Sequence, residues 1–246
     1  MKTAVLVEQI GHAAVDTNLD EGTLRALQVV ALPGEGSGLH WRTRNRFQRI
    51  DNERLGMFRP RTKSVVEIDD CLIAMPGAVA AARAALPHVK REVAVVSHTD
   101  GKHAVVDARG GPILDEHVGS RIWHIHAGSF WQVHRAAPEA FTREVLRLAQ
   151  IRAGDSVLDL YSGSGLFAAP LAVVAGPQGN VTAVEATVSA VRDARRSLSD
   201  LGNVHLVTGD VERWLLESTD EHDVTVLDPP RSGAGQKVIQ IGRAHV

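Results

Sequence analysis

The second half of the chain alternates short apolar runs with amphipathic stretches, and this alternation constrains the fold more than any other feature. Apolar runs predict strands at residues 156–160, 180–185, 204–208 and 223–227. Helical spacing of apolar residues predicts helices at 138–151, 166–175, 188–201 and 211–217. Strands that alternate with helices pair in parallel through right-handed crossovers. We therefore expect an α/β fold with a doubly wound sheet over residues 126–240.

The first 125 residues follow another pattern. Residues 3–12 are helix-like, and an alanine-rich helix that starts at a proline is predicted at 76–85. Strands are predicted at 41–47, 55–58, 92–98, 103–107 and 121–124. The alternation in the first of these strands places one set of side chains on a common face: Trp41, Thr43, Asn45 and Phe47. We expect a smaller α+β domain over residues 1–125.

Composition excludes several classes of protein. The chain has 246 residues and no apolar run of the roughly 18–20 residues that cross a membrane. Glu8 interrupts the N-terminus before the core of a signal peptide can form. The single cysteine, Cys71, excludes an internal disulfide and a zinc site built on several cysteines of this chain. We expect a cytoplasmic monomer without a membrane partner.

The basic residues are unevenly placed. The formal net charge is −2, yet residues 42–63 hold eight basic and two acidic side chains, a local balance of 8 − 2 = +6. Arg42, Arg44 and Arg46 share one face of the predicted strand at 41–47. Such a row is either a solvated basic face or a contact for nucleic-acid phosphates.

The strongest local motif is a strand, a glycine turn and a helix at residues 157–167. Gly163 and Gly165 let a ligand approach the backbone and the helix N-terminus closely. Asp159 precedes the turn, where a carboxylate would repel a pyrophosphate, and Glu185 ends the next strand, where it can bind ribose hydroxyls. A cationic nucleoside without phosphate, such as S-adenosylmethionine, satisfies both positions better than the alternative, a nicotinamide cofactor.

A second motif, Asp228-Pro229-Pro230, directly follows the last predicted strand. Two prolines fix a rigid turn at the edge of the sheet where ligands bind. Enzymes that methylate exocyclic amines carry an aromatic residue after the prolines, and here that residue is Arg231. The motif therefore argues against amino-group methylation, while a plain turn at the end of a strand remains the simpler alternative.

Together with Phe130-Trp131-Gln132-Val133-His134, these two motifs resemble the RNA (uracil-5-)-methyltransferase family, whose members have a class I Rossmann-like fold and form 5-methyluridine in transfer or ribosomal RNA. The resemblance implies S-adenosylmethionine as cofactor, an RNA substrate, and cofactor contacts from Gln132, Tyr161, Glu185 and Asp228, beside Gly163 and Gly165. Asp210, after the third strand, is expected near the adenine, as in class I methyltransferases generally. With this resemblance, we interpret Arg42, Arg44 and Arg46 as RNA-binding residues.

The family's mechanism depends on a cysteine thiolate that adds to C6 of uracil and a glutamate that removes the C5 proton. Both lie beyond the Asp-Pro-Pro-Arg segment in the family, and this sequence holds neither. We therefore assign no catalytic residue and expect this chain by itself to be inactive. Cys71 matches the fourth ligand of an iron–sulfur cluster found in many members. Because the other three cysteines are absent, no cluster is expected here, and a buried apolar role for Cys71 is the alternative.

The two ends of the chain depart from the family pattern. Residues 241–246 match the translation of a common sequencing adapter, and Met1 follows no N-terminal barrel or cluster cysteines. We expect a fragment truncated at both ends and poorly soluble on its own. Two rival functions are kept, an NAD-dependent oxidoreductase and a non-catalytic RNA-binding protein.

Overall fold

The computed structural model describes residues 31–33, 38–98, 100–106, 110–230, 233–235 and 238. The chain divides into two units, Met1–Gly36 and Ser37–Val246, and the second holds every element described below. The helix predicted at residues 3–12, Arg231 and the segment 241–246 lie outside the described residues.

The first part of this unit is an antiparallel sheet covered by a helix. Its five strands run in the order β3-β2-β1-β4-β5. Helix α3 (Ala78–Ala85) and a short 3-10 helix (Leu86–His88) contribute to the core beneath the sheet. The strands are β1 (Arg44–Arg49), β2 (Leu55–Phe58), β3 (Val65–Glu67), β4 (Glu92–Ser97) and β5 (His103–Val106).

The alternation predicted for residues 41–47 is confirmed for its central residues. Thr43, Asn45 and Phe47 are buried, whereas Arg44 and Arg46 point to the other face. Helix α3 begins two residues after the proline from which it was predicted, because Gly77 adopts a left-handed φ of 88° and serves as its N-cap. Strand β3 was not predicted.

A hairpin of β6 (Ile113–Val118) and β7 (Arg121–His126) follows. Strand β6 was also not predicted. Val118, Trp123 and Ile125 of this hairpin belong to the same hydrophobic core as Leu166 and Phe167 of the second half. The hairpin therefore packs with the second sheet. The boundary expected at residue 125 assigns most of it to the first domain instead.

The second sheet is parallel, with the strand order β10-β9-β8-β11. Three of its four strands have the predicted ranges: β8 (Ser156–Leu160), β9 (Asn180–Glu185) and β10 (Val204–Thr208). The fourth, β11 (Val224–Leu227), begins one residue later than predicted. Helices connect them: α5 (Ala168–Ala175), α6 (Val188–Ser197) and α7 (Val211–Glu217).

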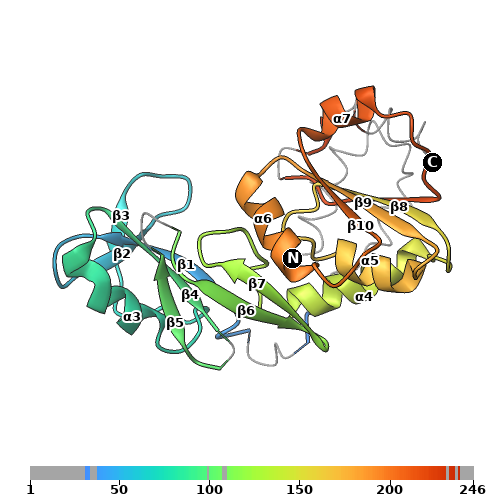
Figure 1. Ribbon diagram of the computed structural model, residues 1–246. Coiled ribbons are helices and arrows are strands. Elements are labelled where there is room, and N and C mark those ends of the chain that lie inside the picture. The colour runs from blue at the N-terminus through green and yellow to red at the C-terminus, as the bar shows by residue number, and fades with distance from the viewer. Residues whose placement is uncertain are drawn as a thin grey trace, which may run out of the picture. The chain divides into compact units, whose positions relative to one another are not determined.

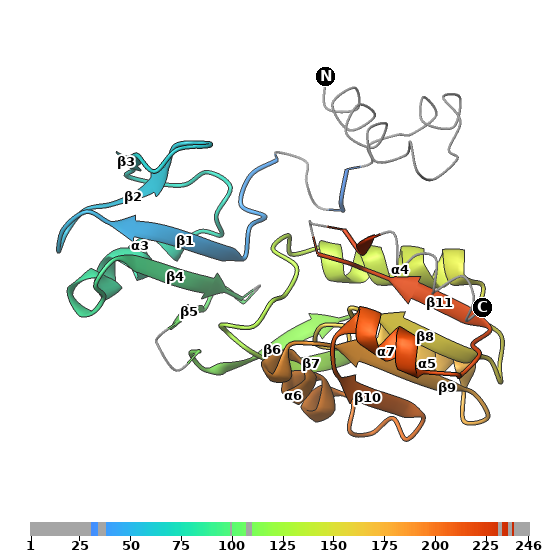
Figure 2. The ribbon, with the colours of Figure 1, turned by 90° about the horizontal axis from the view of Figure 1, so that it is seen from above.

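Helices cover both faces of this sheet, as predicted for a doubly wound fold. Val157 and Val181 face a core that includes α5 residues, and Leu158 and Leu160 face a second core with Val211 and Leu215 of α7. Figure 1 shows α5 and α7 on opposite sides of the strands, and Figure 2 shows β11, β8, β9 and β10 side by side in the sheet. None of the described helices is long and apolar enough to cross a membrane.

Helix α4 (Ala137–Ala149) leads into this sheet. Val145, Leu146 and the following Ile151 pack against the core. Two other apolar residues of this helix, Phe141 and Leu148, are 41% and 65% exposed.

Candidate cofactor site

The carboxyl ends of the four parallel strands bring the predicted cofactor residues to one edge of the sheet. The register pairs Leu160 with Val184, and Leu227 with Leu160, so the residues after β8, β9 and β11 follow one another across this edge. The Asp228 N–H donates to the Leu160 carbonyl at 3.3 Å, and the Gly209 N–H donates to the Glu185 carbonyl at 3.0 Å. We call this edge, with its loops, the carboxyl edge.

The glycine turn after β8 is built from left-handed residues. Tyr161, Gly163 and Gly165 have φ angles of 63°, 55° and 79°. A side chain at Gly165 would meet Leu198 of the α6 segment at 3.0 Å, so this glycine permits close packing of the turn. Around Gly163 a side chain would meet no atom within 4 Å. Gly163 is therefore the point where a ligand can approach the backbone of the turn.

Glu185 joins the end of β9 to this turn. One carboxylate oxygen accepts the Gly163 N–H at 3.0 Å, and the other accepts the Thr187 N–H at 2.6 Å. Each oxygen of an ionised carboxylate has about two acceptor positions. Glu185 is half-buried and can thus hold the turn in place and still accept hydrogen bonds from the hydroxyls of a ribose.

Asp159 is the least expected feature of the carboxyl edge. Its side chain is fully buried, and neither oxygen has a hydrogen-bond partner of ordinary geometry among the described residues. Burial, followed by the negative charge of Asp228, raises the pKa of Asp159 to about 8; Glu185 adds to this, and the nearby Ala168 N–H opposes it. Burial also raises the pKa of Asp228. A carboxyl group in this state favours a cationic neighbour, because a cation would stabilise its ionised form.

Asp210 and Tyr161 lie at the outer part of the edge. Asp210 is the N-cap of α7 and accepts the Arg213 N–H at 3.0 Å through one oxygen. The pKa of the Tyr161 hydroxyl is raised by burial and then by the charges of Asp210 and Glu212. The Tyr161 hydroxyl also contacts the Ala234 carbonyl at 3.5 Å. Because the charge of Asp210 acts on the Tyr161 hydroxyl, these two predicted contact residues lie near each other.

The segment that holds Gln132 is linked to the glycine turn through two tryptophans. The preceding Trp131 is 4% exposed and packs against Trp123 of β7, with ring centroids 5.9 Å apart. The Trp123 indole N–H donates to the Gly165 carbonyl at 3.4 Å. Sequence reasoning did not identify Trp123, because its partner lies 42 residues away. The two tryptophans fix the segment of Gln132 against the turn.

The three arginines predicted to bind RNA are all engaged within the protein. Arg42 donates to the Arg44 carbonyl at 2.9 Å. Arg44 pairs with Glu116 of the β6–β7 hairpin at 2.9 Å, and its side chain is only 12% exposed. Arg46 pairs with Glu92 at 2.7 Å and is 73% exposed. A phosphate at Arg44 would have to displace the carboxylate of Glu116, whose side chain is largely buried. Arg44 therefore has a structural role in the described residues.

Cys71 lies away from the carboxyl edge. It is half-buried and packs against the core of the first sheet. In the described part of the chain, no group of three or more histidine, cysteine, aspartate or glutamate side chains could hold a metal ion. This packing fits the alternative interpretation of Cys71 as a small apolar residue.

The chain is similar to known methyltransferases over most of its length. Residues 131–216 match the family model "Protein-L-isoaspartate(D-aspartate) O-methyltransferase (PCMT)". An uncharacterized RNA methyltransferase of Streptomyces coelicolor is 33% identical over 98% of this chain and 60% of its own length. One of Bifidobacterium longum is 35% identical over 87% of this chain and 57% of its own length. The chain is a homologue of these RNA methyltransferases.

This chain also has the fold of a class I methyltransferase. A solved structure, the Pyrococcus abyssi tRNA (uracil-54, C5)-methyltransferase in complex with S-adenosyl-L-homocysteine, superimposes with a TM-score of 0.64. The superposition covers 86% of this chain and 65% of the P. abyssi chain, and the two sequences are 16% identical. The likeness therefore concerns the fold alone. The chain spans about 60% of the length of the S. coelicolor relative.

Proposed function

We propose that this protein binds S-adenosylmethionine at the carboxyl edge and serves methyl transfer to RNA. The observation that carries the proposal is the set of four carboxylates at the ends of adjacent parallel strands: Asp159, Glu185, Asp210 and Asp228. S-adenosylmethionine brings a cationic sulfur, an ammonium group and a ribose, and it has no phosphate. The RNA part of the proposal is supported by the relatives named RNA methyltransferases.

A nicotinamide cofactor fits this site less well. Its pyrophosphate would approach the glycine turn, where burial and neighbouring negative charge already raise the pKa of Asp159. Adding two phosphates there would increase the repulsion. The rival oxidoreductase function is therefore disfavoured by the same carboxylates that favour a cationic nucleoside.

In the site as proposed, the chain's residues would bind and orient the cofactor. Glu185 would accept from the ribose hydroxyls, Asp210 would lie near the adenine, and Gly163 would allow close approach to the turn. Asp159 and Asp228 would face the cationic part, and Gln132 and Tyr161 would complete the contacts. S-adenosylmethionine would supply an electrophilic methyl group to the substrate.

We further propose that the methylated atom is C5 of a uracil in transfer or ribosomal RNA. The support is the combined pattern of Gln132, the glycine turn and Asp228-Pro229-Pro230. C5 of uracil attacks a methyl donor only after a nucleophile has added to C6. The one cysteine of this sequence, Cys71, packs against the first sheet and is not proposed as that nucleophile. Methyl transfer to C5 should release tritium from RNA that contains [5-³H]uridine, whereas methylation at another atom would leave the tritium in place.

A thermal-shift comparison tests the cofactor site. S-adenosylhomocysteine should raise the Tm of the chain, and NAD at the same concentration should not. Glu185→Gln should reduce this shift severalfold, because one ribose acceptor becomes an amide. Glu217→Gln is the matched control, since Glu217 is exposed at the end of α7 and pairs only with Arg213 among the described residues. A shift with NAD and none with S-adenosylhomocysteine would contradict the proposal.

A further inference from the structure

The eight basic residues between 42 and 63 divide into two groups in the structure. Five of them use their side chains within the protein, on carbonyls, amides or carboxylates: Arg42, Arg44, Arg46, Arg49 and Arg54. The other three, Arg59, Arg61 and Lys63, form no ion pair or side-chain hydrogen bond with described residues. The cations of this stretch are therefore engaged within the protein in one part and free in another.

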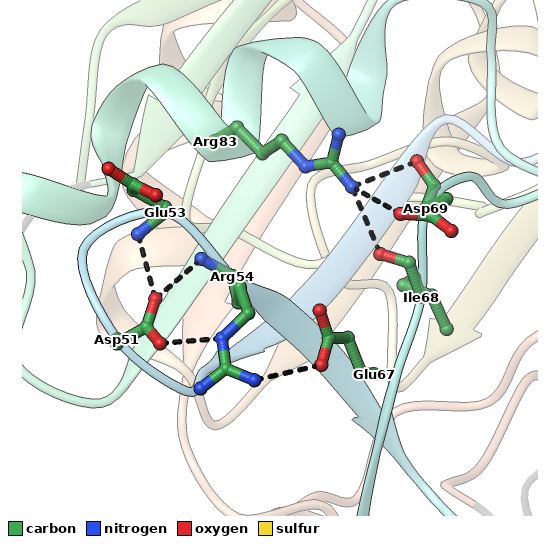
Figure 3. A network of polar contacts seen from close by, with 7 residues as sticks. All are labelled: Asp51, Glu53, Arg54, Glu67, Ile68, Asp69 and Arg83. Carbon is green, nitrogen blue, oxygen red and sulfur yellow. Dashed lines mark hydrogen bonds and ion pairs between the residues drawn. The ribbon is translucent and has the colours of Figure 1, made fainter.

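Arg54 illustrates the engaged group. Its guanidinium contacts Asp51 at 2.6 Å and Glu67 at 3.2 Å, and Asp51 also accepts two backbone N–H groups at the turn between β1 and β2. Figure 3 shows these groups as one network at the end of the strands, with Arg83 bonded separately to Asp69 and the Ile68 carbonyl. A cation held by two carboxylates is a poor contact for a phosphate, because the carboxylates already satisfy it.

The free group lies at the connection between β2 and β3, residues 59–64, which we call the basic tip. All six of its residues are exposed, and none is acidic. The tip is nevertheless an ordered turn. The Arg59 N–H donates to the Ser64 carbonyl at 2.9 Å, the Thr62 N–H donates to the Arg59 carbonyl at 3.1 Å, and the Ser64 N–H donates to the Thr62 hydroxyl at 3.1 Å.

The backbone of the tip presents its cations at a fixed place. Arg61 adopts a left-handed φ of 61°, which reverses the chain at this point. Phe58, the last residue of β2, directly precedes Arg59, and this residue is 51% exposed. An exposed aromatic ring beside unpaired cations combines a stacking surface for bases with contacts for phosphates.

We propose that the basic tip is a contact surface for single-stranded RNA, with Arg59, Arg61 and Lys63 on the phosphates and Phe58 beside a base. This inference rests on the RNA part of the proposed function and replaces the row Arg42, Arg44 and Arg46 as the main phosphate contact. Three unpaired cations and no acidic residue give charge complementarity to a polyanion, and the ring favours a nucleic acid among polyanions.

The test measures binding of a fluorescein-labelled single-stranded RNA of mixed sequence by anisotropy, from low to moderate KCl concentration. The variant Arg59→Gln/Arg61→Asn/Lys63→Gln removes the three charges, and asparagine is used at 61 because it adopts left-handed φ readily. At low salt we expect a loss of affinity of about 10-fold or more. The slope of the logarithm of the association constant against the logarithm of the salt concentration should become shallower by about 2. Each of the three lost phosphate contacts on a single strand accounts for ~0.7 of this change.

The matched control is Lys102→Gln/Arg147→Gln/Arg213→Gln. These three cations are exposed, like those of the tip, but each pairs with a carboxylate. Their partners are, in the same order, Asp100, Glu144 and Glu217. The control changes the net charge equally, and we expect its affinity to stay within about twofold and its salt slope to stay unchanged. Phe58→Leu should weaken binding of the RNA without altering the slope, because it removes a ring and no charge.

Several results would overturn the inference: an unchanged affinity and slope in the tip variant, an equal loss in the control variant, or no RNA binding by the unaltered chain. The S-adenosylhomocysteine shift, measured on the same samples, separates this inference from the cofactor proposal. A tip variant that loses RNA affinity but keeps the shift supports the tip and shows that the fold is intact. An unaltered chain that shows the shift but binds no RNA would reject the tip and leave the cofactor site standing.

Discussion

At the scale of single residues, Asp159 carries the most information. A fully buried carboxyl group without an ordinary hydrogen-bond partner among the described residues is costly unless it is protonated or faces a cation. Its position before the glycine turn was visible in the sequence, and it was interpreted there as a group that repels phosphate. Its burial and its coupling to Asp228 were not visible, because they depend on the pairing of β8 with β11.

The raised pKa of Asp159 predicts a pH-dependent stability. The folded-state pKa of about 8 exceeds the ordinary aspartate pKa of 3.8, so the folded chain keeps a proton that the unfolded chain loses. The resulting stabilisation is complete below about pH 4 and is lost as the pH rises through about 8. Asp159→Asn should remove this dependence and raise the free energy of unfolding at pH 8 by at least ~1.4 kcal/mol, the equivalent of one pKa unit.

Urea denaturation at several pH values measures this effect. Glu139→Gln provides the comparison, because Glu139 is an exposed carboxylate in the first turn of α4. The control should follow the unaltered chain at every pH. A variant at Asp159 with the same pH profile as the unaltered chain would show that the buried carboxyl is ionised in the folded state.

At the scale of elements, a fully buried carboxylate of α6 joins this helix to the β6–β7 hairpin. Asp193 of α6 is fully buried, and its carboxylate accepts from the His126 ring at 2.6 Å, the His126 N–H at 3.1 Å and the Ser129 hydroxyl at 2.7 Å. These bonds tie the end of β7 and the following loop to α6. Arg121 and Asp200 form a second link, which is more exposed.

Asp193→Asn should destabilise the chain by ~2–4 kcal/mol, because an amide NH₂ would then face a buried donor. Asp200→Asn, at the exposed link, should cost less than ~1 kcal/mol. The free energies of unfolding from urea denaturation separate the two links. A similar, small cost for both variants would mean that the hairpin is held by the packing of Trp123 and Ile125 alone.

The elements also show how far sequence reasoning reaches. Strands β8, β9 and β10 were predicted with their ranges because each is a short run rich in valine or leucine between clear turn signals. Strand β6 was missed because Glu116 interrupts its inward-facing side, between Leu114 and Val118. Glu116 is tolerated there because Arg44 pairs with it across 72 residues of sequence. Strand β3 was missed because all of its residues are exposed.

The candidate site was predictable to a similar degree. The parallel order of strands implies that residues after β8, β9 and β11 share an edge, so Tyr161, Glu185 and Asp228 could be grouped from sequence alone. The pairing of the strand arginines could not be predicted, since their partners Glu116 and Glu92 are distant in the chain. Only the structure distinguishes these paired cations from the free ones of the basic tip.

At the scale of the whole molecule, the net charge of −2 conceals two regions of opposite sign. The stretch 42–63 is basic, and the carboxyl edge holds Asp159, Glu185, Asp210 and Asp228. One region suits a polyanion and the other suits a cation, as expected if one protein binds both RNA and S-adenosylmethionine. The two proposals nevertheless make independent predictions, because their residues do not overlap.

The most direct test of the central claim is the dissociation constant of S-adenosylmethionine, measured by calorimetry between about pH 6 and pH 7.5. A cation bound beside Asp159 stabilises its ionised form, so affinity should increase with pH in this range, with release of protons to the buffer. NAD should show no detectable binding at either pH. Binding of NAD in place of S-adenosylmethionine, or an affinity for S-adenosylmethionine that falls as the pH rises, would contradict the account of the carboxyl edge.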